Sequence, residues 1–430
     1  MRALMKAMVI AVLTVGGLTW AVERFPPPQF ESNYVRPTEV LRGPRPVIWE
    51  SIDLAVLFAG LFLASLFVHK VRYRRAIFGL MIVSLLYLGF FRKGCICPVG
   101  ALQNVASAVF TQGRSIPLFV VLLFVGPLLF SLFFGRVFCG AVCPLGAVQD
   151  LVVVRPLSIP GWLESIGRLA GYTYLGLAVI TAAISGVFLV CRYDPFVSIF
   201  RFSGNLYILI LGGCLVVIGL FVARPYCRFV CPYGMILRNL SRLARRPVTI
   251  SPEDCINCGL CAAACPFGAI KGPTRPLQRA MISRFRGLFL AWLVGTIILI
   301  LAGLWLGRMA GSGISRLDTT VQMAASLAKK RVGPSYIQEA VAAYLASGGS
   351  AEGLTQDAAA ILARYRLGGA LLGAWMGLVI GAKALAACMV RPGKDYYADP
   401  ASCLACGRCF VYCPKEHLRR GDVRSDHGQN

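Results

Sequence analysis

The sequence predicts an all-α protein that crosses a membrane about eight times and carries a small cysteine-rich module beside the membrane. Three observations lead to this fold class. Hydrophobic residues make up 57% of the 430 residues and charged residues only 15%, which excludes an ordinary soluble domain. Long apolar stretches are separated by short basic ones. Two cysteine runs of identical spacing, split between residues 255–266 and 403–414, predict the module.

The two runs read C-I-N-C-G-L-C-A-A-A-C-P from Cys255 and C-L-A-C-G-R-C-F-V-Y-C-P from Cys403. Both match C-x2-C-x2-C-x3-C-P, the bacterial ferredoxin spacing for [4Fe–4S] clusters. A zinc site or disulfides are the alternatives. Zinc sites favour pairs of C-x2-C over four-cysteine runs that end in Cys-Pro.

In this motif the fourth cysteine ligates the other cluster of a pair. The predicted ligands of the first cluster are Cys255, Cys258, Cys261 and Cys413. Those of the second cluster are Cys403, Cys406, Cys409 and Cys265. Because most cysteines fall in metal-ligand spacings, we expect a reducing compartment, the cytoplasm, to face both runs.

The spans can be assigned in chain order. Residues 4–22 predict a first helix, which we interpret as an uncleaved anchor because no small-x-small cleavage site is clear. Residues 51–68 end in a basic block from His69 to Arg75, which marks the cytoplasmic side. Residues 76–91 form a third span, shorter than the ~20 residues usually needed. The other predicted spans are 116–134, 169–190, 206–222, 288–306 and 367–389.

Eight spans place both termini in the cytoplasm and both ferredoxin runs on one side, as shared clusters require. The predicted domains are an anchor and periplasmic loop (1–50), a membrane domain (51–250), the first half of the ferredoxin module (251–287), a transmembrane helix (288–308), a periplasmic helical insertion (309–366), a transmembrane helix (367–390), and the second half of the module with a tail (391–430). In the insertion, residues 321–330, 336–345 and 357–365 predict short amphipathic helices.

Related motifs follow four of the spans, which indicates duplication. They read C-I-C-P from Cys95, C-G-A-V-C-P from Cys139, C-R-Y-D-P from Cys191 and C-R-F-V-C-P from Cys227. Consecutive copies end successive crossings, so we expect them to alternate between the outer and the inner face. The two inner copies would gather Cys139, Cys143, Cys227 and Cys231 into a third [4Fe–4S] site, because helix N-termini stabilise thiolates. The alternative is that these are small buried core cysteines.

The two outer copies predict a fourth cluster on the periplasmic side, held by Cys95, Cys97, Cys191 and Asp194. Asp194-Pro195 stands where the inner copies have Cys-Pro, and a carboxylate can bind iron. A hydrocarbon core ~30 Å thick would otherwise separate the inner clusters from an outer acceptor. The alternatives are exposed thiols, a disulfide to Cys191, or an Asp194 that caps a helix or pairs with Arg192 or Arg201.

Nucleic-acid binding and haem are not expected. The net charge of +25 could indicate nucleic-acid binding, but the arginines flank the spans as cytoplasmic anchors do. With three histidines (His69, His417 and His427) and no C-x-x-C-H motif, no haem is expected. No nucleophile–base set or nucleotide fingerprint is evident, which favours an electron-transfer subunit over a free-standing enzyme.

These motifs resemble the NosR/NapH-type membrane polyferredoxins, over roughly residues 75–305 and 365–415. The resemblance implies a subunit of a redox complex in the bacterial cytoplasmic membrane, carrying electrons between a quinol or cytoplasmic donor and periplasmic reductases or their maturation systems. No covalent flavin is expected, since no S-G-A-T-like attachment motif occurs. Two alternatives stay open. One is a quinol dehydrogenase subunit with its own quinone site, where His69 and Asp53 could serve proton chemistry. The other is an assembly or redox-sensing factor resembling the CcoG group.

Overall fold

A computed structural model describes residues 46–94, 96–110, 116–154, 156–157, 159–201, 206–250, 255–273, 279–329, 335–388 and 395–420. The predicted first span at residues 4–22 and most of the loop after it lie outside these residues. The described part is mostly helical, as the sequence predicts, and its strands form a two-stranded ladder.

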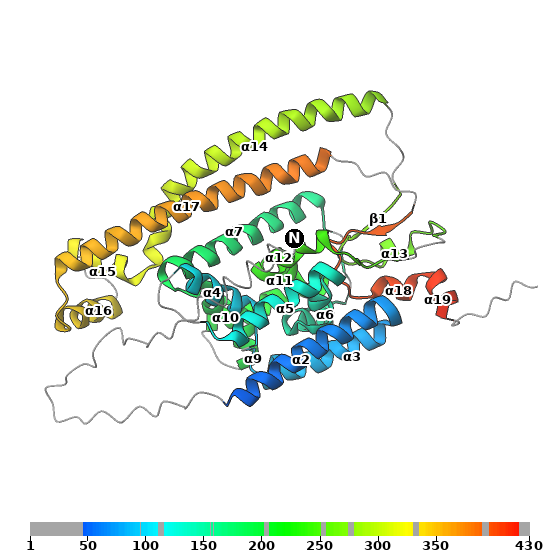
Figure 1. Ribbon diagram of the computed structural model, residues 1–430, viewed down its shortest axis with the longest axis horizontal. Coiled ribbons are helices and arrows are strands. Elements are labelled where there is room, and N and C mark those ends of the chain that lie inside the picture. Colours follow the sequence, from blue (N-terminus) through cyan, green and yellow to red (C-terminus); the bar gives the residue numbers. More distant parts are fainter. Residues whose placement is uncertain are drawn as a thin grey trace, which may run out of the picture.

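The N-terminal described helices form one flank of the molecule (Figure 1). Helix α2 (Val47–Leu66) continues into the π-helical turn η1 (Phe67–Val71), and α3 (Arg74–Ser84) continues into η2 (Leu85–Phe91). Both are long and apolar enough to cross a membrane. Arg72, with φ of 54°, makes the sharp turn between them.

The opposite flank is a helical hairpin of α14 (Arg279–Ile314) and α17 (Ala351–Cys388), side by side in Figure 1. Glycines allow the two backbones to touch: a Cβ on Gly373 would lie 1.8 Å from the carbonyl oxygen of Gly303. Such small-residue contacts are typical of helix pairs in membranes, where close packing replaces the hydrophobic effect.

Helices η5 (Ser315–Leu317), α15 (Thr319–Lys329) and α16 (Ser335–Ala346) join the two arms of this hairpin. The helices predicted at residues 321–330 and 336–345 therefore exist. The separate helix predicted at residues 357–365 is wrong, because this segment is the beginning of α17. No proline interrupts residues 351–388, so one helix continues from the insertion into the span.

Among the described residues, five helices are long and apolar enough to cross a membrane: Val47–Val71, Arg74–Phe91, Gly161–Ser185, Gly287–Leu317 and Ala351–Cys388. Two apolar helices are shorter, α5 (Leu118–Phe134) and α10 (Leu206–Phe221). Helix α7 (Gly161–Ser185) ends before the predicted residue 190, because Gly186 takes a left-handed conformation with φ of 64°. The total of eight spans and their sidedness stay predictions.

The cysteine-rich module lies at one end of the molecule, and α15 and α16 lie at the other (Figure 1). It contains α13 (Leu260–Ala263), α18 (Arg408–Tyr412) and α19 (Pro414–Arg420). Its two halves are joined by the antiparallel strands β1 (Ile270–Lys271) and β2 (Tyr397–Ala398), with Ile270 opposite Ala398. This ladder brings the two cysteine runs together although more than a hundred residues separate them.

Short helices fill the centre between the flanks (Figure 1). They are α4 (Pro98–Phe110), η3 (Phe138–Val142), α6 (Pro144–Val152), α8 (Leu189–Tyr193), α9 (Pro195–Arg201), α11 (Pro225–Phe229), α12 (Pro232–Leu240) and η4 (Ser241–Leu243). Each of the four repeat motifs follows a residue with positive φ, namely Gly94, Gly135, Gly186 or Arg224. At these turns the chain leaves a long helix and folds back into the interior.

Candidate functional site: cysteine-lined cavities

The first predicted ligand set lines one cavity of the module. Cys255, Cys258 and Cys261 of the first run and Cys413 of the second run surround it, together with Tyr396. The fourth cysteine of the second run thus lies beside the first three cysteines of the other run.

The second set shows the reciprocal arrangement. The thiol of Cys409 lies in the electrostatic field of Cys403, Cys406 and Cys265. Both loops share one backbone conformation, since the third and fifth residues of each run have positive φ: 52° and 75° at Asn257 and Gly259, 52° and 70° at Ala405 and Gly407. That likeness makes the module a pseudo-symmetric pair of loops.

No group of three His, Cys, Asp or Glu side chains in the described ranges is arranged to hold a single metal ion. The thiols instead surround cavities. A cubane cluster holds its ligands farther apart than one ion does, because each thiolate binds a different iron. Burial raises the pKa of the Cys403 thiol to about 12, so binding of a metal centre there must release a proton.

The third predicted set lines a cavity in the centre of the molecule. Cys139 and Cys143 reach it from η3 and the start of α6, and Cys227 and Cys231 from α11 and the start of α12. Cys139, Cys227 and Cys231 are buried and Cys143 is partly buried.

Local sequence explains why these thiols converge. Cys143 and Cys231 are the N-cap residues of α6 and α12, and a proline follows each at the first helical position. The amide of Gly234 donates a hydrogen bond of 3.3 Å to Cys231 Sγ. A Cβ on Gly146 would lie 2.9 Å from the Cys139 carbonyl oxygen, so the motif C-P-x-G needs a glycine there.

Sequence reasoning missed Gln149, which forms a hydrogen bond to one of the cysteines that line the cavity. Its fully buried side chain donates a hydrogen bond of 3.3 Å from Nε2 to Cys227 Sγ, and its Oε1 accepts from the backbone N–H of Tyr226 at 2.9 Å. A signal was present in the sequence: Gln149 and Gln103 occupy the same place, six residues after the Cys-Pro cysteine, in two repeat copies.

Two buried arginines supply positive charge next to the thiols. Nη2 of Arg136 lies 4.0 Å from Cys139 Sγ, and its buried Nε has no hydrogen-bond partner in the described part of the chain. Arg224 is fully buried and donates to the backbone carbonyls of Cys139 and Gly140. Buried positive charge is costly where it is not fully compensated, and an anionic cluster on four thiolates would offset the charge of Arg136. The residues around this cavity therefore fit a [4Fe–4S] cluster.

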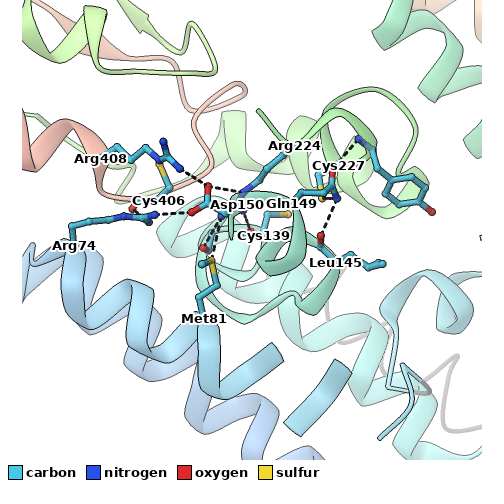
Figure 2. A network of polar contacts seen from close by, with 12 residues as sticks. Arg74, Met81, Cys139, Leu145, Gln149, Asp150, Arg224, Cys227, Cys406 and Arg408 are labelled. Carbon is cyan, nitrogen blue, oxygen red and sulfur yellow. Dashed lines mark hydrogen bonds and ion pairs between the residues drawn. The ribbon is translucent and has the colours of Figure 1, made fainter. Parts of the chain in front are cut away.

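Figure 2 shows the polar network that joins this cavity to the module. The buried carboxylate of Asp150, at the end of α6, pairs with Arg74 at 2.6 Å, Arg408 at 3.2 Å and Arg224 at 3.4 Å. Burial alone would raise the pKa of Asp150, but the three guanidinium groups outweigh it and hold the pKa below its ordinary value. Arg408 belongs to the second cysteine run, so the network crosses the junction.

Backbone contact completes the junction. A Cβ on Gly140 would lie 2.4 Å from the carbonyl oxygen of Leu404 and 2.9 Å from that of Ala405. Arg74 also donates a hydrogen bond of 2.6 Å to the carbonyl of Cys406. The loop between Cys139 and Cys143 therefore lies directly against the loop between Cys403 and Cys406.

The two outer repeat copies differ from expectation. Cys97 and Asp194 line the same central cavity as the four inner cysteines, so the expected separation of the two sets across the membrane is wrong. The cause is the turn before each motif, at Lys93–Gly94 and at Gly186, which returns the chain to the interior. Cys191 is exposed, with its Sγ 3.5 Å from Oε1 of Gln103. Cys95 lies outside the described residues.

Asp194 also caps a helix, which is one of the alternatives that the sequence left open. Its Oδ1 accepts a hydrogen bond of 2.9 Å from the amide of Phe196 at the start of α9, and its Oδ2 accepts one of 3.3 Å from the hydroxyl of Tyr226. Burial raises the pKa of Asp194 to about 6.

The two candidates for quinol proton chemistry both have structural partners. Asp53 is fully buried, pairs with Arg92 and accepts a hydrogen bond of 3.0 Å from the hydroxyl of Tyr87. Nε2 of His69 lies 3.1 Å from the carbonyl oxygen of Phe134.

Comparison with known proteins agrees with the cysteine chemistry. A family of 4Fe–4S binding domains matches residues 76–117, 116–160 and 205–251, which contain three of the four repeat motifs. A second 4Fe–4S binding family matches residues 248–271, the first ferredoxin run. Four segments of the chain are thus similar to iron–sulfur binding domains.

Similar proteins include YccM of Escherichia coli strain K12, a candidate electron transport protein, at 27% identity over 50% of this chain and 64% of YccM. The regulatory protein NosR of Stutzerimonas stutzeri is 28% identical over 51% of this chain and 33% of NosR. The methylamine utilization ferredoxin-type protein MauN of Methylobacillus flagellatus is 28% identical over 35% of this chain and 54% of MauN. The chain spans less than two thirds of the length of these relatives. No solved structure matches. The predicted resemblance to NosR-type polyferredoxins is confirmed.

Proposed function

We propose that this chain, a relative of the NosR-type membrane polyferredoxins, relays electrons across the bacterial cytoplasmic membrane. Electrons pass between a cytoplasmic or quinone-pool partner and a periplasmic redox partner, in either direction. The chain is an electron-transfer subunit of a larger complex rather than an enzyme with its own substrate.

The observation that carries this proposal is the junction between the module and the central cavity. Gly140 lies against the carbonyls of Leu404 and Ala405, so one loop contact separates Cys139 from the second cysteine run. Arg224 lies in the electrostatic fields of both Cys227 and Cys406. Thiols of the module and thiols of the membrane interior thereby belong to one continuous buried structure.

Each cysteine set has a defined task in this proposal. Cys255, Cys258, Cys261 and Cys413 would hold one [4Fe–4S] cluster, Cys403, Cys406, Cys409 and Cys265 the second, and Cys139, Cys143, Cys227 and Cys231 the third. When bound, such clusters accept and release single electrons, with reduction potentials that depend on charge and hydrogen bonding around them.

The chain's own residues do the rest. Helices α6 and α12 fix the direction of the Cys143 and Cys231 thiols, and Gln149 holds Cys227 through its amide. The ion pairs of Asp150 with its three arginines hold the module against the membrane domain. The ring of Phe410, fully buried beneath the guanidinium of Arg72 at 4.5 Å, helps to exclude water from the junction.

A function as a quinol dehydrogenase receives less support. Asp53 is engaged in an ion pair and His69 in a contact with a backbone carbonyl. Both are positioned as structural groups.

Transfer across a sealed membrane tests the proposal. The purified chain would be reconstituted anaerobically into liposomes that contain ferricyanide, and dithionite or a reduced quinol analogue would be added outside. We expect at least one of the two donors to reduce the trapped ferricyanide. The variant Cys227→Ala/Cys231→Ala should lose this reduction, whereas Cys214→Ala, in the apolar helix α10, should keep it. Equal rates in liposomes with wild-type protein and with the double variant would refute the relay.

A further inference from the structure

The central cavity is also lined by Cys97 and Asp194, which the three clusters above do not use and which come from the two outer repeat copies. We call these two copies one half of the repeat and the two inner copies, with Cys139, Cys143, Cys227 and Cys231, the other half. Both residues are well shielded: Asp194 is 4% exposed, and Cys97 is partly buried beside it. Cys191 is exposed, and a Cβ on Gly100, three residues after Cys97, would lie 3.6 Å from its Sγ.

The two halves are built alike. Cys97 precedes Pro98 and Gly100 as Cys143 precedes Pro144 and Gly146, and Asp194 precedes Pro195 as Cys231 precedes Pro232. Helix α4 contacts α8 as α6 contacts α11. Cys191 on α8 therefore corresponds to Cys227 on α11, a residue that we assign to the central cluster.

Gln103 gives an independent indication of a ligand. Its side chain is fully buried, Oε1 lies 3.5 Å from Cys191 Sγ, and Nε2 has no hydrogen-bond partner among the residues that the structure describes. The corresponding Gln149 instead donates from Nε2 to Cys227 Sγ. The oxygen and nitrogen of a glutamine amide are assigned from their surroundings. Turning the Gln103 amide over would satisfy Nε2 with Cys191 Sγ as the acceptor, as Cys227 Sγ is for Gln149, and a thiolate is a stronger acceptor than a thiol. A metal-bound Cys191 is such a thiolate.

Asp194 keeps capacity for a metal. Its donors, the amides of Phe196 and Val197 and the Tyr226 hydroxyl, are neutral, and a carboxylate offers about four acceptor positions. Tyr226 also links the halves, because its backbone N–H is bound by Gln149.

We propose that Cys97, Cys191 and Asp194 bind a further iron–sulfur cluster, with Gln103 as the hydrogen-bond donor to Cys191. The inference rests on the proposed function and extends its relay by one carrier beside the central cavity, whose lining includes Cys97 and Asp194 but not the exposed Cys191. A cluster fits better than one ion, because no three such side chains in the described ranges converge on a single point. Mixed thiolate and carboxylate ligation distinguishes this centre from the three thiolate-only centres.

The test compares iron content and low-temperature EPR spectra of the full chain after anaerobic purification. Wild-type protein should hold about sixteen irons, the content of four [4Fe–4S] clusters. Cys97→Ser/Asp194→Asn keeps polar helix caps at both positions but weakens both ligands. This variant should lose one cluster and one EPR signal while the other three signals persist. Asp194→Cys should keep the iron and move the midpoint potential of that one signal downward, because thiolate donates more charge than carboxylate.

Unchanged iron and unchanged signals in the double variant would overturn the inference. That outcome leaves the relay itself intact, because the relay is tested separately by Cys227→Ala/Cys231→Ala in liposomes. A disulfide between Cys97 and Cys191 would also overturn it, and mass spectrometry after alkylation under denaturing conditions, with and without reductant, would detect that bond.

Discussion

Individual cysteines in this chain lie beside cysteines that are distant in sequence, and Cys265 is the clearest case. It belongs to the first run, but its charge acts together with those of Cys403 and Cys406 on Cys409. We therefore expect Cys265→Ala to abolish the EPR signal of the cluster on Cys403, Cys406 and Cys409, and to spare that on Cys255, Cys258 and Cys261. Cys413→Ala should give the opposite pattern. Loss of the local cluster in either variant would refute the exchange of ligands.

Arg136 should tune the central cluster through its charge. Its guanidinium lies 4.0 Å from Cys139 Sγ, and positive charge near a cluster stabilises the reduced, more negative state. Arg136→Gln is expected to lower the midpoint potential by roughly 50–100 mV, since 59 mV corresponds to a tenfold change for one electron. Arg136→Lys should recover most of this difference. An EPR-monitored redox titration gives both values, and an unchanged midpoint in Arg136→Gln would contradict the assignment.

At the scale of elements, the Asp150 network fixes the module to the membrane domain. Removal of a buried charge leaves Arg224 uncompensated, a change that typically costs about 3–5 kcal/mol. Asp150→Asn should therefore increase hydrogen exchange of the amides in α18 and the loop before it, whereas exposed Asp357→Asn on α17 should not. Equal exchange in Asp150→Asn and wild type would show that the network does not hold the module.

The same carboxylate gives a pH dependence. The pKa of Asp150 is lowered in the folded state, so its stabilising contribution is present above the ordinary aspartate pKa of about 3.9 and is lost as the pH falls further. The protection factor of the α18 amides in the wild type, which corrects for the intrinsic pH dependence of exchange, should fall on acidification below that value. In Asp150→Asn the protection factor should be low at every pH, and a parallel acid response in both proteins would exclude Asp150 as the titrating group.

The hairpin of α14 and α17 depends on glycine contacts. A side chain on Gly373 has no room beside Gly303, whereas a Cβ on Gly313 of α14 meets no described atom within 4 Å. Gly373→Leu should separate the helices and lower the melting temperature of the detergent-solubilised protein by several degrees, and Gly313→Leu should leave it nearly unchanged. Similar melting temperatures for the two variants would mean that the close contact is not needed.

Sequence patterns predicted the local elements better than their depth in the molecule. Cys-Pro-x-Gly predicted helix starts at Cys143 and Cys231, because proline and glycine act within a few residues. The placement of Cys97 and Asp194 in the central cavity was not predictable, because counting spans assumes that each motif emerges at a membrane face. Backbone turns at Gly94 and Gly186 determine the actual path, and a glycine's φ cannot be read from the sequence.

At the scale of the whole molecule, the structure links an end module, a charged junction and a central cavity. The ferredoxin spacing predicted which cysteines would meet in the module, since their pairing is part of the motif. Asp150, Gln149 and Arg136 were not predicted, because buried polar partners are chosen by tertiary contacts over long sequence distances. Those partners connect the module to the central cavity, so that the two predicted parts pack against each other.

The central claim is that a cluster on Cys139, Cys143, Cys227 and Cys231 lies next to the module. EPR of the fully reduced full chain tests it most directly, because neighbouring paramagnetic clusters broaden and split one another's signals. The account predicts that Cys227→Ala/Cys231→Ala removes one signal and simplifies the spectrum of the cluster on Cys403, Cys406, Cys409 and Cys265. A module spectrum identical in wild type and variant, with equal iron content, would contradict it.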